Sequence, residues 1–199
     1  VREAVPADFG AMIALWNRSV EAGEVVYAPI DEALFQAKLA RPDAIMLVAE
    51  ADGQLAGWIH GVADSGHADV PGYLTVIFVA KAFRRQGVGT ALLRALEESF
   101  RALGKEMIAS SGNNPVRLRW CVPGTPSHDH NNAPGVDEEC AGYPFLIANG
   151  LEPKFHEVAM YMNLADYTWP KKMDDIRDKL LQEGIYVGRY DGASELGYD

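Results

Sequence analysis

The feature that most constrains the fold is a glycine-containing turn between an apolar run and a helix. Residues 73–80, YLTVIFVA, form a continuous apolar run, which predicts a central strand buried on both faces of a sheet. Gly87 and Gly89 follow, and apolar residues then recur at helical spacing up to Leu103. Free N–H groups at the start of a helix attract anions, and glycine lets an anion approach the backbone. The order therefore predicts a phosphate site.

This turn differs from the two best-known phosphate-binding loops. A Walker loop ends in Gly-Lys-Ser/Thr, whereas this turn continues with Thr90 and Ala91. A Rossmann turn needs a third glycine where this chain has Leu92, a residue of the apolar stripe of the helix. Arg84 and Arg85 precede the glycines and can add charge-assisted hydrogen bonds to a phosphate. The alternative interpretation is a structural loop with solvated arginines.

The rest of the first 110 residues predicts an α/β domain. Residues 44–50 and 54–63 are apolar runs on either side of Asp52-Gly53, a dipeptide that favours the type I′ turn of a hairpin. We also expect helices at residues 9–16 and 31–40 and a strand at residues 105–110.

Residues 79–104, VAKAFRRQGVGTALLRALEESFRALG, resemble the acetyl-CoA-binding motif of the GNAT superfamily of N-acetyltransferases. That motif, Arg/Gln-x-x-Gly-x-Gly/Ala, is matched by Arg84-Arg85-Gln86-Gly87-Val88-Gly89. The strand before it and the helix after it fit as well. The resemblance extends over residues 1–165, which we expect to form one domain, with Leu151 at a place where an aromatic residue is usual.

The resemblance implies an α/β fold with a mixed, mostly antiparallel sheet of six or seven strands and helices on both faces. Two central strands of the family splay apart around the pantetheine arm of the cofactor; here they would be residues 73–80 and 105–110. The backbone of Phe78 and Val79 would pair with the pantetheine amides like an added strand. The remaining cofactor-binding residues implied, around the pyrophosphate of acetyl-CoA, are Arg84, Arg85, Gln86, Gly87, Val88, Gly89 and Thr90.

The resemblance also implies direct transfer of the acetyl group to an amine. The Val79 N–H would stabilise the developing oxyanion. Many family members carry a basic carboxylate on the central strand, and this strand has none. The candidates for the base are therefore His60, Glu50, Asp64 and Asp69, with a hydrogen-bonded structural role as the alternative for His60.

The general acid is open as well. Many members of the family have a tyrosine four residues before a closing glycine, and the corresponding residue here is Leu146, four residues before Gly150. Tyr143 lies nearby at a different offset and is the candidate catalytic acid. The alternative is that water takes this part.

Residues 111–139 interrupt the resemblance with four prolines and three glycines, which predicts a long loop or insertion. An acidic lid over the acceptor site is one interpretation. A zinc site built from Cys121, His128, His130 and Cys140 is another, but their spacing lacks the pairs typical of zinc ligands, so we expect no metal. The third is a plain surface or dimer-contact loop.

The net charge of −10 argues against nucleic-acid binding; it either favours a cationic partner or only serves solubility. No apolar run approaches the length of a membrane span, so we expect no membrane partner. With two cysteines and no export signal, we expect a cytoplasmic protein. Residues 166–199 predict a helix and a strand that form a packing extension, a homodimer contact or the start of a second domain.

These features favour an N-acetyltransferase that moves an acetyl group from acetyl-CoA, its co-substrate, to the primary amine of a small, cationic acceptor. The rival hypothesis is a non-catalytic CoA-binding sensor or the regulatory half of a tandem acetyltransferase. It rests on the missing strand carboxylate and the missing tyrosine.

Overall fold

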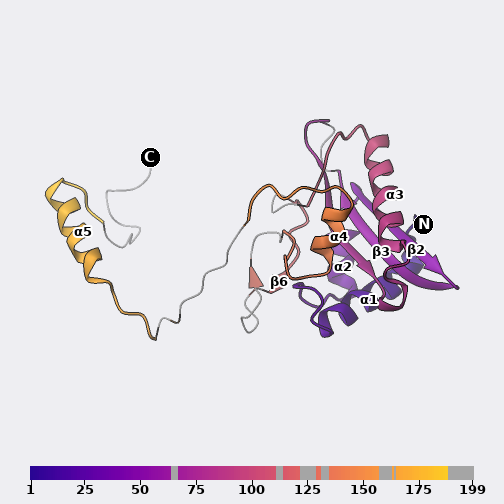
Figure 1. Ribbon diagram of the computed structural model, residues 1–199, viewed down its shortest axis with the longest axis horizontal. Helices are drawn as coiled ribbons and strands as arrows, with labels where there is room; N and C mark the ends of the chain where they lie inside the picture. The colour runs from indigo at the N-terminus through magenta and orange to yellow at the C-terminus, as the bar shows by residue number, and fades with distance from the viewer. Residues whose placement is uncertain are drawn as a thin grey trace. The chain divides into compact units, whose positions relative to one another are not determined.

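The computed structural model describes residues 1–63, 67–110, 114–121, 129–130, 135–156, 163 and 165–187. The chain divides into two compact units, Val1–His156 and Glu157–Asp199, and each is described by itself. In the first unit a β-sheet carries helices on both of its faces (Figure 1).

The first unit contains both helices and strands. Its helices are α1 (Phe9–Glu21), α2 (Glu32–Leu39), α3 (Val88–Ala102) and α4 (Gly142–Ala148), with the 3-10 turns η1 (Pro6–Asp8) and η2 (Lys81–Phe83). Its strands are β1 (Arg2–Glu3), β2 (Ala44–Ala51), β3 (Gln54–Val62), β4 (Gly72–Val79), β5 (Ile108–Ala109), β6 (Trp120–Cys121) and β7 (Asp129–His130). The second unit contains α5 (Lys171–Gln182).

The main sheet has five strands in the order β1-β2-β3-β4-β5. Neighbours run antiparallel except β4 and β5, which are parallel, so the predicted mixed, mostly antiparallel α/β sheet is confirmed. Among the described residues the sheet has five strands where six or seven were expected, and β6 pairs with β7 in a separate ladder. Apolar and polar residues alternate in residues 154–164, KFHEVAMYMNL, which predicts one more strand, but this segment falls largely outside the described residues.

The β2–β3 hairpin forms where the sequence predicts it. Asp52 and Gly53 have φ values of 52° and 71°, both in the left-handed region that a type I′ turn requires. This turn sets the register of β2 on β3, the strand on which β4 pairs.

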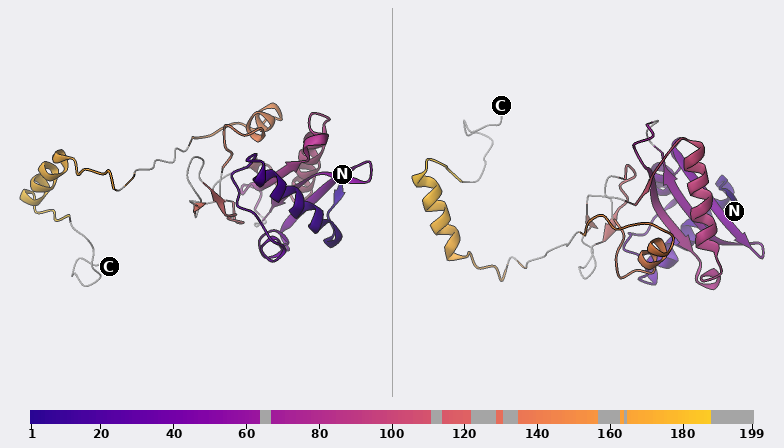
Figure 2. Two further views of the ribbon diagram at one scale, coloured as in Figure 1. Left: turned by 90° about the horizontal axis from the view of Figure 1, so that it is seen from below. Right: turned by 45° about the horizontal axis from the view of Figure 1, so that its top comes forward.

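The sheet buries one apolar core on each face. The two cores lie beneath α1 and α3, which cover opposite faces of the sheet (Figure 2). On one face, Trp16 of α1 and Phe35 of α2 pack against Trp58 of β3. On the other, Leu92 and Leu96 of α3 lie fully buried among residues of β3 and β4. The helical spacing of the apolar residues in α3 produces this single buried face.

Residues 114–121, the start of the predicted insertion, belong to the first core. Val116 and Leu118 are buried there, and the Ala28 N–H donates to the Arg119 carbonyl oxygen (3.1 Å). This part of the segment is therefore not a surface loop. The alternation of apolar residues in this stretch indicates its burial. The many prolines of the segment led to the prediction of a loop instead.

The second unit holds the amphipathic helix predicted near residues 171–183. Pro170 precedes α5, and Trp169 Nε1 donates to Asp174 Oδ1 in its first turn (3.2 Å). The boundary predicted at residue 165 and the dimer contact predicted for this segment stay predictions. Within the described part of the chain, no helix combines the length and the apolar character needed to cross a membrane.

Gly57 tests the close packing of β3 on β4. A Cβ at this position would lie 2.6 Å from the Phe78 carbonyl oxygen and 3.3 Å from Val79 Cα, both backbone atoms. We expect Gly57→Ala to lower the free energy of unfolding by about 1–3 kcal/mol, measured by urea unfolding. The control is Gly10→Ala in α1, where a Cβ meets no atom within 4 Å and alanine favours the helix. Wild-type stability of Gly57→Ala would contradict this register.

Candidate active site

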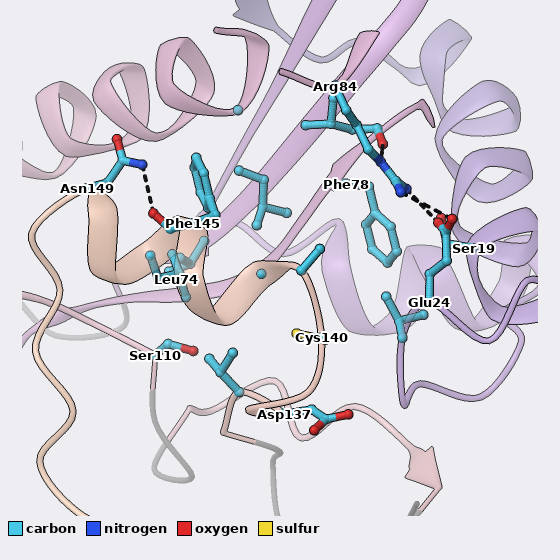
Figure 3. A pocket seen from close by; sticks show the side chains of 18 of the residues that line it. Ser19, Glu24, Leu74, Phe78, Arg84, Ser110, Asp137, Cys140, Phe145 and Asn149 are labelled. Carbon is cyan, nitrogen blue, oxygen red and sulfur yellow. Dashed lines mark hydrogen bonds and ion pairs between the residues drawn. The ribbon is translucent and has the colours of Figure 1, made fainter. Parts of the chain in front are cut away.

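A cavity of about 610 Å³ lies beside β4 in the first unit (Figure 3). Its walls come from the end of α1 and the loop that follows, from β4, from the glycine-containing turn and from residues 135–149. The lining residues that matter below are Ser19, Glu24, Tyr27, Thr75, Ile77, Phe78, Val79, Arg84, Arg85, Gly87, Gly89, Thr90, Ser110, Asp137, Cys140 and Leu146.

The two strands predicted to splay separate after two residue pairs. Gly72 of β4 pairs with Ile108 of β5, and Tyr73 pairs with Ala109. β4 then continues to Val79 without a strand partner on this side among the described residues. The backbone groups on this side that no side chain binds are thus available to a ligand; the Thr75 and Val79 carbonyls accept hydrogen bonds from Tyr27 and Arg84.

A β-bulge in β4 lies where the separation begins. His60 of β3 pairs with Val76, but the next residue, Gly61, pairs with Leu74, so Thr75 is an extra residue in β4. A bulge bends its strand and increases the local twist. The open edge therefore starts at Thr75.

The pairing of β4 with β3 determines which residues use this edge. The Ala80 N–H donates to the Ala56 carbonyl (2.8 Å), and hydrogen-bonded pairs alternate along an antiparallel ladder. The backbone of Phe78 therefore faces β3, and that of Ile77 and Val79 faces the open edge. This pairing favours Ile77 and Val79 over Phe78 as the residues whose backbone a ligand would meet; the ring of Phe78 lines the cavity, and its contact with a cofactor stays a prediction. The sequence analysis did not identify Ile77 as a residue of the open edge. The alternation of backbone hydrogen bonds along a strand could have shown that Ile77 and Val79 share one edge.

The turn after β4 ends in a helix terminus that faces the cavity. Gly87, with a φ of 83°, caps α3, and the first intrahelical bond runs from the Ala91 N–H to the Gly87 carbonyl oxygen (2.9 Å). The N–H groups of residues 88–90 have no partner within the helix, which makes this end attractive to an anion. Arg85 has a φ of 61°, a conformation that costs a non-glycine residue energy.

The structure brings together most of the residues predicted to hold a pyrophosphate. The turn residues that line the cavity are Arg84, Arg85, Gly87, Gly89 and Thr90. Two others point elsewhere: Gln86 Nε2 donates to the Ala82 carbonyl (2.8 Å), and Val88 packs against the second core. Contact of these residues with a cofactor stays a prediction.

Arg84 links three parts of the site. Its Nε donates to the Val79 carbonyl oxygen (2.9 Å), and its two terminal nitrogens contact Glu24 at 2.5 and 3.1 Å (Figure 3). Hydrogen bonding from Arg84 lowers the pKa of Glu24, which stays ionised. Arg84 therefore holds β4, the turn and the loop after α1 together, whereas Arg85 makes no side-chain ion pair with a described residue.

The predicted bases do not converge on the cavity. His60 is fully buried, with Nδ1 against the Thr75 hydroxyl and Nε2 donating to the Leu39 carbonyl (3.0 Å), and it does not line the cavity. Burial lowers its pKa to about 4, so the ring is neutral and the contacts favour its structural role. Glu50 pairs with Arg2 on the surface.

Two further candidates contribute nothing to the described cavity. Asp69 is exposed and does not line it, and Asp64 lies outside the described residues. Tyr143 lies in the first turn of α4 and does not line the cavity, whereas Leu146, the residue at the usual tyrosine position, does line it. Neither places a general acid there.

The predicted insertion supplies Gly135, Val136 and Asp137 to the cavity, and Cys140, the residue after it, lines the cavity as well. Asp137 Oδ1 accepts the Glu139 N–H (3.0 Å), and the described residues give this carboxylate no cationic partner. No group of three or more His, Cys, Asp or Glu side chains in the described ranges is arranged to hold a metal ion. His128, needed for the zinc alternative, lies outside those ranges.

The sequence matches the model of the acetyltransferase (GNAT) family over residues 12–117, which is more than half of the chain. No curated protein matches it significantly. The matched segment includes α1, the hairpin, β4, the turn and α3, and so the open edge and the helix terminus described above.

Solved structures with related folds are distant in sequence. An aminoglycoside antibiotic 6'-N-acetyltransferase from Acinetobacter haemolyticus is 17% identical, with a TM-score of 0.54 over 82% of this chain and 97% of that one. AAC(6')-Iy with a bisubstrate analogue, CoA-S-monomethyl-acetylneamine, has 17% identity and a TM-score of 0.53 over 81% and 95%. A transcriptional regulator from Bacillus halodurans has 15% identity and a TM-score of 0.53 over 81% and 97%. These matches show the fold.

Gly89 tests the helix terminus as an anion site. A Cβ there would lie 3.2 Å from the Phe145 ring, so little room exists for a side chain. We expect Gly89→Glu to abolish CoA binding in isothermal titration calorimetry, because bulk and negative charge enter the site of the pyrophosphate. Gly89→Ala, which needs only a small shift of Phe145, should retain binding. Unchanged CoA affinity in Gly89→Glu would contradict the assignment.

His60 tests a structural role against a catalytic one. Its pKa is about 4 in the folded chain and near 6.5 when exposed, so protonation favours the unfolded chain and stability falls as the pH drops through this window. We expect a loss of about 2 kcal/mol between pH 7 and 5 in urea unfolding. His60→Gln should remove most of this pH dependence. An unchanged dependence in the variant would refute the structural role.

Proposed function

The chain belongs to the GNAT family of acetyltransferases, and on this basis we propose that it transfers an acetyl group from acetyl-CoA directly to the primary amine of a small, cationic acceptor. One observation carries the proposal: one cavity is lined by the anion-attracting terminus of α3, the open edge of β4 and Asp137, a carboxylate with no cationic partner among the described residues.

The donor would lie along β4. The N–H groups at the start of α3 would hold the pyrophosphate, and Arg85 would add its charge. From there the pantetheine arm would extend along the edge that Ile77 and Val79 present, forming backbone hydrogen bonds as an added strand does. The Val79 N–H, which has no partner in the β3–β4 ladder, lies at the pyrophosphate end of this edge, where it would donate to a pantetheine amide rather than to the thioester oxygen.

The acceptor would meet Asp137. Glu24 is already neutralised by Arg84, which leaves Asp137 as the lining carboxylate with no cationic partner among the described residues. It can attract an ammonium group and take a proton from it before the neutral amine attacks the acetyl carbon. The names of two similar folds, both aminoglycoside N-acetyltransferases, are consistent with an acceptor that carries several amines.

The alternative function is a CoA-binding sensor without turnover. It is favoured by one observation, that neither Tyr143 nor a strand carboxylate lines the cavity. The two functions differ in whether free thiol is released from acetyl-CoA when an amine is present.

Asp137→Asn tests the acceptor end of the cavity. We expect wild-type protein to release thiol with at least one member of a panel of polyamines, aminoglycosides and amino-acid amides. Because the variant loses the charge and the base, kcat/KM for the amine should fall by about 10²-fold, with KM for acetyl-CoA unchanged. The control is Glu139→Gln, which keeps the backbone N–H bound to Asp137.

Two results would contradict this account. Equal losses for donor and acceptor would show that Asp137 is structural. CoA binding without thiol release on any amine would favour the sensor.

A further inference from the structure

Tyr27 is a residue of the cavity that neither the sequence motif nor the family resemblance singles out. It lies in the loop after α1 and reaches the edge of β4 where that edge opens. Resting on the proposed acetyl transfer, we propose that the Tyr27 hydroxyl donates the proton to the sulfur that leaves the thioester.

The backbone around Tyr27 is held firmly. Tyr27 forms a β-bridge with Trp120, and the residues on either side of Tyr27 are also bonded to this segment: the Ala28 N–H donates to the Arg119 carbonyl oxygen (3.1 Å), and the Val26 carbonyl accepts a backbone N–H. Residues 114–121, which pack in the first core, thus fix the main chain from which this side chain extends.

The side chain of Tyr27 is positioned by rings and by one hydrogen bond. Its ring lies against Trp16 and Phe78, with centroid separations of 5.0 and 6.4 Å. Its hydroxyl donates to the Thr75 carbonyl oxygen (3.1 Å). This carbonyl belongs to the bulge residue of β4, the point where the open edge starts.

The direction of the cavity places Tyr27 at the acyl end of a bound donor. The helix terminus that would hold the pyrophosphate follows Val79, and Thr75 lies four residues back along the strand. At about 3.3 Å a residue, this edge spans roughly 13 Å, a length that suits an extended pantetheine arm. The thioester would then lie beside the bulge and within reach of the hydroxyl held there.

Other hydroxyl and thiol groups that line the cavity are placed differently. Thr90 lies in the first turn of α3, at the pyrophosphate end, and Ser19 is buried within α1. Ser110 and Cys140 line the same cavity, but the structure gives neither a side-chain hydrogen bond to β4. Tyr27 is the donor that the described contacts fix on the strand edge.

The proton transfer balances within the proposed reaction. The amine nitrogen forms a bond to the acetyl carbon, the C–S bond breaks, and its electron pair stays on sulfur. The Tyr27 O–H turns from the neutral Thr75 carbonyl to the more basic thiolate and protonates it, so that CoA leaves as the thiol. The proton that the nitrogen loses restores the hydroxyl. Burial raises the pKa of Tyr27, so the group stays protonated through the working range.

The test uses Tyr27→Phe and two acetyl donors, acetyl-CoA and its selenoester analogue, with hydroxylamine as a small acceptor that needs no acceptor pocket. A selenolate leaves without protonation far more readily than a thiolate. With acetyl-CoA we expect kcat to fall by about 10²-fold and KM to stay unchanged. With the selenoester the fall should be less than about threefold, because that donor no longer needs the acid.

Tyr73→Phe is the matched control, since it removes a hydroxyl from a β4 residue that does not line the cavity. It should behave as wild type with both donors. Thermal unfolding of each variant checks that the fold is intact.

Equal losses with the two donors, or no loss with acetyl-CoA, would overturn the role of Tyr27 and leave the proposed function standing. A larger selective loss in Tyr143→Phe than in Tyr27→Phe would assign the acid to α4 and overturn it as well. Wild-type protein that binds CoA and acetylates neither hydroxylamine nor any amine would overturn the proposed function, and this role with it.

Discussion

The site depends on a difference between the two edges of β4. One edge pairs with β3 from Tyr73 to Val79 except at the bulge residue Thr75, and the other loses its partner when β5 departs after Tyr73. Unpaired backbone groups in a half-buried place are costly, so this edge is a strong recognition surface for an extended chain carrying amides. The bulge at Thr75 and the helix that starts at Val88 define the two ends of that surface.

Arg84 and Tyr27 join this edge to the rest of the molecule. Arg84 binds the Val79 carbonyl at one end of the edge, and Tyr27 binds the Thr75 carbonyl at the other. Arg84 also contacts Glu24, which lies three residues before Tyr27 in the loop after α1. The loop after α1 therefore contacts both ends of the open edge of β4, one through Glu24 and Arg84 and the other through Tyr27. This loop lines the cavity as well. Between these two contacts, the backbone N–H and C=O of Ile77 remain available to a ligand.

Local patterns predicted much of this architecture. The hairpin at Asp52-Gly53, the apolar strand and the turn leading into α3 each follow from a few adjacent residues, and the family motif lies in the same stretch. What sequence reasoning missed depends on long-range contacts. The burial of Val116, the approach of Tyr27 to β4 and the enclosure of His60 all join segments far apart in the chain. Spacing along the sequence carries no such information.

The central claim is that CoA adds to the open edge of β4 as a strand does. Amide hydrogen exchange measured by NMR, with and without CoA, tests it residue by residue. The account predicts that the Ile77 and Val79 amides exchange more slowly when CoA is bound, while the Phe78 amide, already paired with β3, is protected in both states. CoA binding that leaves the exchange of Ile77 and Val79 unchanged would contradict the account.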